Sequence, residues 1–237
     1  MSTGPESSVP NLGTLKNISW LTKRQLDQLA RALTLSRFDK RSVIYAEGNF
    51  PESAYLLLSG VARITCRNRK GQRVVVMMVA PGMIPGFPPT APGIDYNFRC
   101  EAVTACQIGT VDFEAFLEIS LGVASTNFKR LAATYLGRWH LAQLRCSNFM
   151  SCTLAERLAL TLLELAEHFG VSDPRGLRLT ATMTHKDLAD LVGASRPRVT
   201  EYLNELERKQ MLVRANRELI VKRDALETFL SQAHSSF

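Results

Sequence analysis

The segment VGASRPRVTEYLNEL, residues 192–206, decides how the C-terminal part of this chain folds. A Gly-Ala-Ser turn leads into two arginines that flank a proline, and apolar residues at helical spacing follow. Cationic side chains in the first turn of a helix face the positive end of the helix dipole, which costs about 0.3–1 kcal/mol. Arg196 and Arg198 therefore break a local rule, and such a break indicates a functional role.

The residues around this segment complete a pair of short helices. Thr184 can cap a helix that begins at His185, and Gly193 can end it. Ser195 can cap the second helix, where Pro197 falls in the first turn and its missing amide hydrogen does no harm. The expected apolar faces are Leu188, Ala189, Leu191 and Val192 in the first helix and Val199, Leu203 and Leu206 in the second. Two short helices joined by a glycine turn form a helix-turn-helix unit.

Such a unit places the start of its second helix in the major groove of DNA. The forked guanidinium of arginine suits guanine O6 and N7 as well as phosphates. Glu201, one turn on, can accept a hydrogen bond from a cytosine amino group or pair with Arg198. Ser195, Thr200 and the first amides of the helix can bind phosphates. The predicted DNA-binding residues are Thr184, His185, Lys186, Ser195, Arg196, Pro197, Arg198, Thr200 and Glu201.

Two strand-like runs follow in MLVRANRELIVKR, residues 211–223. They predict a β-ribbon that resembles the wing of a winged helix-turn-helix, with Arg214 and Arg217 along the DNA backbone. An ordinary charged hairpin is the alternative interpretation.

The rest of the chain changes its hydrophobic period twice. Residues 15–35 have helical spacing, and short β-branched runs separated by Gly and Pro then predict antiparallel strands of a small barrel or sandwich. From Phe113 the spacing is helical again. The expected domains are a flexible tail (1–14), a β-roll sensor (15–120), a long helix (121–148) and a winged helix-turn-helix domain (149–237).

The long helix carries apolar residues close to heptad spacing, among them Phe128, Leu131 and Tyr135. This spacing indicates a coiled-coil dimer seam, or else a helix that lies across its own barrel. The fold class is thus α+β: an antiparallel β-roll, a long helix and a winged helix-turn-helix.

Charge and composition set limits on the partners. The formal net charge is +7, yet residues 150–237 contain twelve Lys and Arg against twelve Asp and Glu. The net charge of this part is zero, so a case for DNA binding depends on local placement rather than on total charge. The apolar runs are interrupted by Pro and Gly, and no leader pattern opens the chain, so we expect a cytoplasmic protein.

Five cysteines, Cys66, Cys100, Cys106, Cys146 and Cys152, have no metal-binding spacing. Free and mostly buried thiols are the simplest interpretation. A redox pair, either Cys100 with Cys106 or Cys146 with Cys152, is the alternative.

The order of these elements carries a family resemblance. A β-roll, a long helix and MTHKDLADLVGASRPRVTEYLNELERKQMLVRANRELIV (183–221) together resemble the CRP/FNR family of bacterial transcription regulators from about Leu15 to Phe229. SAYLLLSGVARI (53–64) and APGMIPG (80–86) agree with it. The resemblance implies a homodimer on a palindromic DNA site, joined along the long helix and controlled through the β-roll. It also implies that the loop 168–176 could contact RNA polymerase.

The same resemblance argues against the best-known effectors. Members that bind cyclic nucleotides carry a Gly-Glu pair and an Arg-Ser pair, where this chain has PGFP (85–88) and Tyr96-Asn97. Cyclic AMP is therefore disfavoured, since its phosphate needs a cation. An N-terminal iron–sulfur cluster is disfavoured because no cysteine precedes Cys66, and a haem would have only His140 as a ligand in this half.

We therefore expect no bound cofactor and leave the effector open. An uncharged or aromatic ligand, a thiol switch or activity without ligand all fit the sequence. The candidate effector pocket is Pro85, Gly86, Phe87, Tyr96 and Asn97.

Two other function classes fit the sequence less well. An enzyme with a cupin-like barrel should show clustered histidines and carboxylates, but residues 42–112 contain no histidine, so we expect no enzyme. A cyclic-nucleotide-binding-like interaction module with a vestigial helix-turn-helix is the other alternative.

Overall fold

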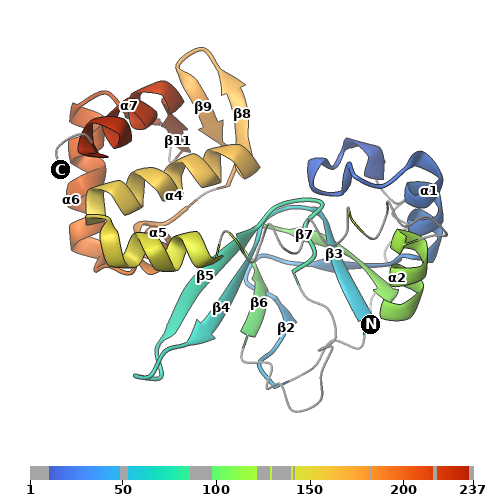
Figure 1. Ribbon diagram of the computed structural model, residues 1–237. Coiled ribbons are helices and arrows are strands. Elements are labelled where there is room, and N and C mark those ends of the chain that lie inside the picture. The colour runs from blue at the N-terminus through green and yellow to red at the C-terminus, as the bar shows by residue number, and fades with distance from the viewer. Residues whose placement is uncertain are drawn as a thin grey trace. The chain divides into compact units, whose positions relative to one another are not determined.

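The computed structural model describes residues 11–48, 53–85, 98–121, 129, 140, 142–181, 183–215 and 218–234 (Figure 1). The chain divides into two compact units, Met1–Trp139 and His140–Phe237. Within the described ranges, no helix is long and apolar enough to cross a membrane.

Two antiparallel sheets form the body of the N-terminal unit. The first has the order β1 (Thr34–Phe38), β7 (Cys106–Asp112), β3 (Ser53–Ser59), and the second β2 (Val43–Tyr45), β6 (Phe98–Ala102), β4 (Ala62–Arg67), β5 (Arg73–Val79). Glycines that follow or separate these strands, namely Gly48, Gly60, Gly71 and Gly82, have positive φ. The predicted roll of antiparallel strands is confirmed.

Short helices cover one face of the first sheet. They are η1 (Leu12–Thr14), η2 (Lys16–Ile18), α1 (Lys23–Ala32) and α2 (Phe113–Leu121). Thr22 and Gln25 form a capping box at the start of α1, and Gln25 Nε2 also donates to the carbonyl oxygens of Ile119 and Ser120 at 2.9 and 3.0 Å. Leu12 belongs to the core cluster and is 4% exposed, so the predicted tail of residues 1–14 extends too far.

The C-terminal unit contains the helices α4 to α7 and one sheet, besides the helical residues 142–151. The helices are α4 (Leu154–Phe169), α5 (His185–Val192), α6 (Arg196–Arg208) and α7 (Arg223–His234), and the strands are β8 (Gly170–Asp173), β9 (Gly176–Leu179), β10 (Leu212–Ala215) and β11 (Glu218–Val221). The sheet order is β10-β11-β9-β8. The expectation of a loop over residues 168–176 was wrong for most of this range, because α4 continues to Phe169 and Val171, Ser172 and Asp173 pair with β9.

The expected buried faces of the two short helices are confirmed. Leu188, Ala189, Leu191 and Val192 of α5 and Val199, Leu203 and Leu206 of α6 are all buried. They form one core with Leu158 and Leu162 of α4, Ile220 of β11 and Leu226 of α7. These apolar side chains therefore pack α5 and α6 into the interior of the C-terminal unit.

The helical residues 142–151 belong to the C-terminal unit. The sequence placed the boundary of the C-terminal domain between residues 148 and 149, whereas the structure divides the chain between Trp139 and His140. The predicted seam residues Phe128, Leu131 and Tyr135 lie outside the described residues.

Candidate nucleic-acid interface

The turn between α5 and α6 is built on Gly193. Its backbone has φ 64° and ψ 45°, the left-handed conformation that glycine adopts most readily. Its amide donates to carbonyl oxygens of Ala189 and Asp190 and so closes α5. A Cβ at this position would lie 2.4 Å from Cε1 of Phe149. Both the conformation and the space therefore require glycine, as the sequence predicted.

The start of α5 is closed by a capping box. The backbone amide and hydroxyl of Thr184 donate to Asp187 Oδ2 at 3.0 and 2.7 Å, and the Asp187 amide donates back to Thr184 Oγ1 at 3.1 Å. Lys186, predicted to bind DNA, forms an ion pair with Asp190 one turn on. Thr184 and Lys186 are exposed, and His185 is half-buried.

The start of α6 is open to solvent. Ser195, Arg196, Pro197 and Arg198 are all exposed. Ser195 occupies the N-cap position, but its side chain makes no capping hydrogen bond, so the expected cap is only partly realised. The Ser195 hydroxyl and the first amides of the helix are therefore available to an external acceptor.

The two arginines have no acidic partner in the described part of the chain. The guanidinium of Arg196 makes no ion pair or hydrogen bond there, and that of Arg198 lies 5.9 Å from the ring centre of Tyr202. Glu201 is exposed and does not pair with Arg198 in the described structure. Of the two roles that the sequence left open for Glu201, the ion pair with Arg198 is therefore not formed. Two cations thus lie unneutralised at the amino end of a helix.

Thr200 connects the two helices. His185 Nδ1 lies 2.8 Å from Thr200 Oγ1, and that hydroxyl donates to the carbonyl oxygen of Arg196 at 3.0 Å. Since the hydroxyl hydrogen is used in this bond, we assign the proton between His185 and Thr200 to Nδ1. Burial, then Arg214 and Arg196, lower the pKa of His185 below its usual value.

The wing residue Arg214 is bound to the recognition helix α6. Its Nε donates to Glu207 Oε2 at 2.8 Å, and its Nη2 donates to Asn204 Oδ1 at 2.7 Å. The ribbon itself is confirmed as β10 and β11, which pair from Leu212 opposite Val221 to Ala215 opposite Glu218. Arg217 lies outside the described residues.

These links between elements could not be read from the sequence. His185 and Thr200 are 15 residues apart, and Arg214 is 7 and 10 residues from Glu207 and Asn204. In each contact the two residues lie on different elements, so no repeat within one helix or strand brings them together. The opposite charges of Glu207 and Arg214 were the one available signal.

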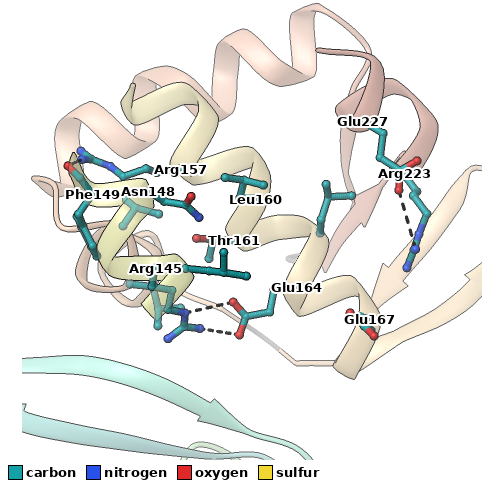
Figure 2. Close-up of a pocket in the computed structure, with 14 residues that line it drawn as sticks. Arg145, Asn148, Phe149, Arg157, Leu160, Thr161, Glu164, Glu167, Arg223 and Glu227 are labelled. Atoms are coloured by element: carbon teal, nitrogen blue, oxygen red, sulfur yellow. Dashed lines mark hydrogen bonds and ion pairs between the residues drawn. The ribbon is translucent and has the colours of Figure 1, made fainter. Parts of the chain in front are cut away.

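A pocket of about 320 Å³ lies on the C-terminal unit beside the end of α5, and its lining side chains are drawn in Figure 2. Arg145 donates to both carboxylate oxygens of Glu164, at 2.6 and 3.2 Å. The guanidinium of Arg157 lies 5.1 Å from the ring centre of Phe149, and its Nη1 donates to the Phe149 carbonyl at 3.3 Å. These contacts hold residues 142–151 against α4, so that Phe149 reaches the turn at Gly193.

One residue of the predicted effector pocket is described. The carbonyl oxygen of Pro85 accepts a buried hydrogen bond from the Tyr45 hydroxyl at 2.7 Å, and the Tyr45 ring lies 5.8 Å from that of Tyr55. Gly86, Phe87, Tyr96 and Asn97 lie outside the described residues.

Two family models match the two units. Residues 35–121 match the cyclic nucleotide-binding domain, and residues 156–229 match the Crp-like helix-turn-helix domain. The chain belongs to the CRP/FNR family. This CRP/FNR protein is a DNA-binding transcription regulator. The interaction module with a vestigial helix-turn-helix is not favoured.

Its relatives are regulators rather than enzymes. The chain is 27% identical over 199 residues to the nitrogen fixation regulation protein FixK of Azorhizobium caulinodans, covering 83% of this chain and 79% of FixK. It is 22% identical over 195 residues to the global nitrogen regulator of Synechococcus elongatus, covering 80% and 86%. It is 23% identical over 189 residues to the cAMP-activated global transcriptional regulator CRP of Escherichia coli, covering 79% and 88%.

Solved structures agree with this CRP/FNR fold. FixK2 of Bradyrhizobium japonicum has a TM-score of 0.70 and 22% identity, covering 83% of this chain and 96% of that one. A CooA variant of Carboxydothermus hydrogenoformans has a TM-score of 0.66 and 19% identity, covering 91% and 95%. The predicted succession of β-roll and winged helix-turn-helix is therefore confirmed.

Proposed function

We propose that this regulator binds a palindromic DNA site as a homodimer, with the start of α6 in the major groove of each half-site. The observation that carries the proposal is the pair of exposed arginines, Arg196 and Arg198, which have no acidic partner in the described part of the chain. Such cations are unfavourable for the helix by itself. Contacts of the two arginines with guanine edges or phosphates would compensate for this unfavourable interaction.

Matched alanine variants test the roles of these arginines. Arg196→Ala and Arg198→Ala should each weaken binding to the selected duplex by about 5- to 150-fold, the range for a base contact of 1–3 kcal/mol. Arg208→Ala is the control, because Arg208 is exposed on the same helix but at its other end. Equal effects of all three variants would mean that only net charge matters.

The dimer is proposed from the heptad-like spacing of Phe128, Leu131 and Tyr135. Sedimentation of the full chain tests it, and a Leu131→Glu variant should shift the protein toward monomer. From a pool of random duplexes, the purified protein should select a sequence that contains two half-sites spaced by about one helical turn. A monomer that selects a single half-site would contradict this arrangement.

Control of DNA binding is proposed to work without cyclic AMP. The support is the sequence at residues 85–88 and 96–97, which lacks the acid and the arginine that hold a cyclic phosphate in related regulators. An uncharged effector, a thiol state or ligand-free activity remain the candidates. Cyclic AMP added to the ligand-free protein should leave the affinity for the selected duplex unchanged.

A contact with RNA polymerase is proposed for the β8–β9 hairpin. Its turn is exposed at Pro174 and Arg175, and the Arg175 amide and side chain donate to Asp173. Arg175→Ala should lower transcription from a target promoter without changing the affinity of the protein for DNA. We propose that the protein acts in the cytoplasm.

A further inference from the structure

We propose that the pocket on the C-terminal unit binds a small amphipathic molecule that has one carboxylate and an aliphatic body. The pocket is formed by residues of this unit alone, so it is a different site from the candidate effector pocket of the β-roll. Its volume of about 320 Å³ lies within the range of small-molecule sites in proteins. The proposal does not depend on DNA binding.

The pocket follows one side of α4. Arg157, Leu160, Glu164 and Glu167 line it, and they follow one another at intervals of three or four residues, so they lie on the same side of the helix. The fully buried Leu158 belongs to another side, which faces the core. The packing of the core therefore leaves this side of α4 free to bind a ligand.

Aliphatic side chains form much of the lining. They come from the helical segment 142–151, from α4 and from the end of α5, and they are Leu144, Leu160, Leu163, Leu191 and Val192. Leu144 is 43% exposed, so an occupant would remove part of its apolar surface from water. Burial of apolar surface stabilises a complex in proportion to the area. The lining therefore suits an aliphatic chain.

Arg157 differs from the other two arginines of the pocket. Arg145 forms an ion pair with Glu164, and Nη1 of Arg223 lies 4.0 Å from Oε1 of Glu227. Within the ranges that the structure describes, Arg157 forms no ion pair. One cation of the pocket thus has no counter-charge from these residues.

The guanidinium of Arg157 is also incompletely hydrogen-bonded. Its Nη1 donates to the carbonyl oxygen of Phe149 at 3.3 Å, and its Nε is buried without an acceptor. Its Nη2 has no acceptor among the described residues. A half-buried cation with unused donors is unfavourable. A carboxylate at the outer nitrogens would supply both an acceptor and the opposite charge.

The two ends of the pocket differ in charge, which sets the direction of the ligand. Figure 2 shows Arg157, Asn148 and Phe149 at one end and Glu167 and Glu227 at the other. The two glutamates would repel a carboxylate. The ligand carboxylate is therefore placed at Arg157, where the side-chain amide of Asn148 can donate a second hydrogen bond.

The Arg157 end of the pocket adjoins the helix-turn-helix. The Phe149 ring centre lies 5.1 Å from the guanidinium of Arg157, and the same ring would meet a Cβ on Gly193. A molecule bound at Arg157 would therefore lie beside the residue that packs against the turn between α5 and α6.

Titration of octanoate into the full-length protein, below the concentration at which octanoate forms micelles, tests for the site. We expect one saturable site per chain. 1-Octanol has the same chain without the charge and should bind about tenfold or more weakly, because a charge-assisted hydrogen bond is lost. The methyl NMR signals of Leu160 and Val192 should shift with octanoate, whereas those of Leu57 in the core of the N-terminal unit should not.

Variants of the pocket arginines test which cation holds the carboxylate. Arg157→Gln should weaken octanoate binding by about tenfold or more, and Arg157→Lys, which keeps the charge, should weaken it less. Arg223→Gln is the matched control, because it removes the same charge from the same pocket beside a carboxylate, and it should leave the affinity unchanged. Thermal unfolding without ligand checks that the variants are folded.

Three results would overturn the proposal: octanoate does not bind, 1-octanol binds as tightly, or Arg157→Gln and Arg223→Gln weaken binding equally. If Arg157→Gln does not fold, the comparison with 1-octanol and the NMR shifts in wild type decide the question. Since no DNA is present in these measurements, the proposed function stands whichever result is obtained.

Discussion

At the scale of single residues, the His185 imidazole is the group whose protonation acts most directly on the recognition helix. It is half-buried, it contacts Thr200, and Arg196 and Arg214 act on it electrostatically. Burial and these two cations lower its pKa in the folded state. The unfolded chain therefore binds more protons than the folded chain just below the ordinary pKa of about 6.5.

The free energy of unfolding should accordingly be highest above about pH 6.5 and fall as the pH drops below it. His185→Asn can still donate to Thr200 but does not titrate, so it should flatten this dependence. Urea unfolding between pH 5 and pH 8 measures it, with His168→Asn as the control that keeps the His185 contact. Equal pH slopes for wild type and His185→Asn would refute this account.

The cysteines differ in their predicted reactivity because they differ in burial. Burial raises the pKa of Cys100 to about 12, and Cys106 is also buried with a raised pKa. Cys146 is exposed. Thiolate is the reactive form, so timed alkylation followed by mass spectrometry should modify Cys146 first and Cys100 only on unfolding. Cys146→Ser should remove the fastest phase; early modification of Cys100 in the folded protein would contradict this order.

At the scale of elements, the turn between α5 and α6 depends on one glycine. Gly193→Ala should destabilise the C-terminal unit by about 1–3 kcal/mol, since a side chain there is strained at φ 64° and its Cβ meets Phe149. Gly71→Ala is the control for strain alone, because φ is 73° there but no atom lies within 4 Å of the added Cβ. Chemical denaturation measures both.

The contact with Phe149 can be separated from strain by a second variant. In a Phe149→Ala background, Gly193→Ala should cost less than it does in wild type, because the ring that meets the new Cβ is gone. An unchanged cost would assign the whole effect to backbone strain.

These two helices were also the elements that sequence reasoning placed best. Caps and breakers act within a few residues, so Thr184 and Gly193 marked the ends of α5 from local chemistry alone. Strand β8 was missed because Pro174 and Gly176 indicate a turn, while Val171 and Ser172 become a strand through pairing with β9. The Arg214–Glu207 pair was missed for the same reason: it joins elements whose relative placement depends on the folded core.

At the scale of the whole molecule, the excess positive charge does not lie in the part of the chain that contains the helix-turn-helix. The helix-turn-helix third of the chain has as many acidic as basic residues, and the excess of +7 lies in the first 149 residues. Ion pairs neutralise Glu205 and Glu207 of α6, whereas Arg196 and Arg198 have no acidic partner among the residues that the structure describes. We therefore expect Arg196 and Arg198 to supply local attraction to DNA at the start of α6.

The dependence of binding on salt tests this local attraction. Each phosphate that the protein neutralises contributes about 0.9 to the slope of log affinity against log salt. The double variant Arg196→Ala/Arg198→Ala should bind the selected site more weakly at every salt concentration, and its slope should be smaller by about 0.9 for each phosphate that these arginines neutralise in wild type. Lys23→Ala, on α1 of the N-terminal unit, should change neither quantity, since Lys23 is distant in sequence and belongs to the other compact unit. An equal decrease of the slope in Lys23→Ala would mean that DNA responds to the total charge of the molecule and not to the end of α6.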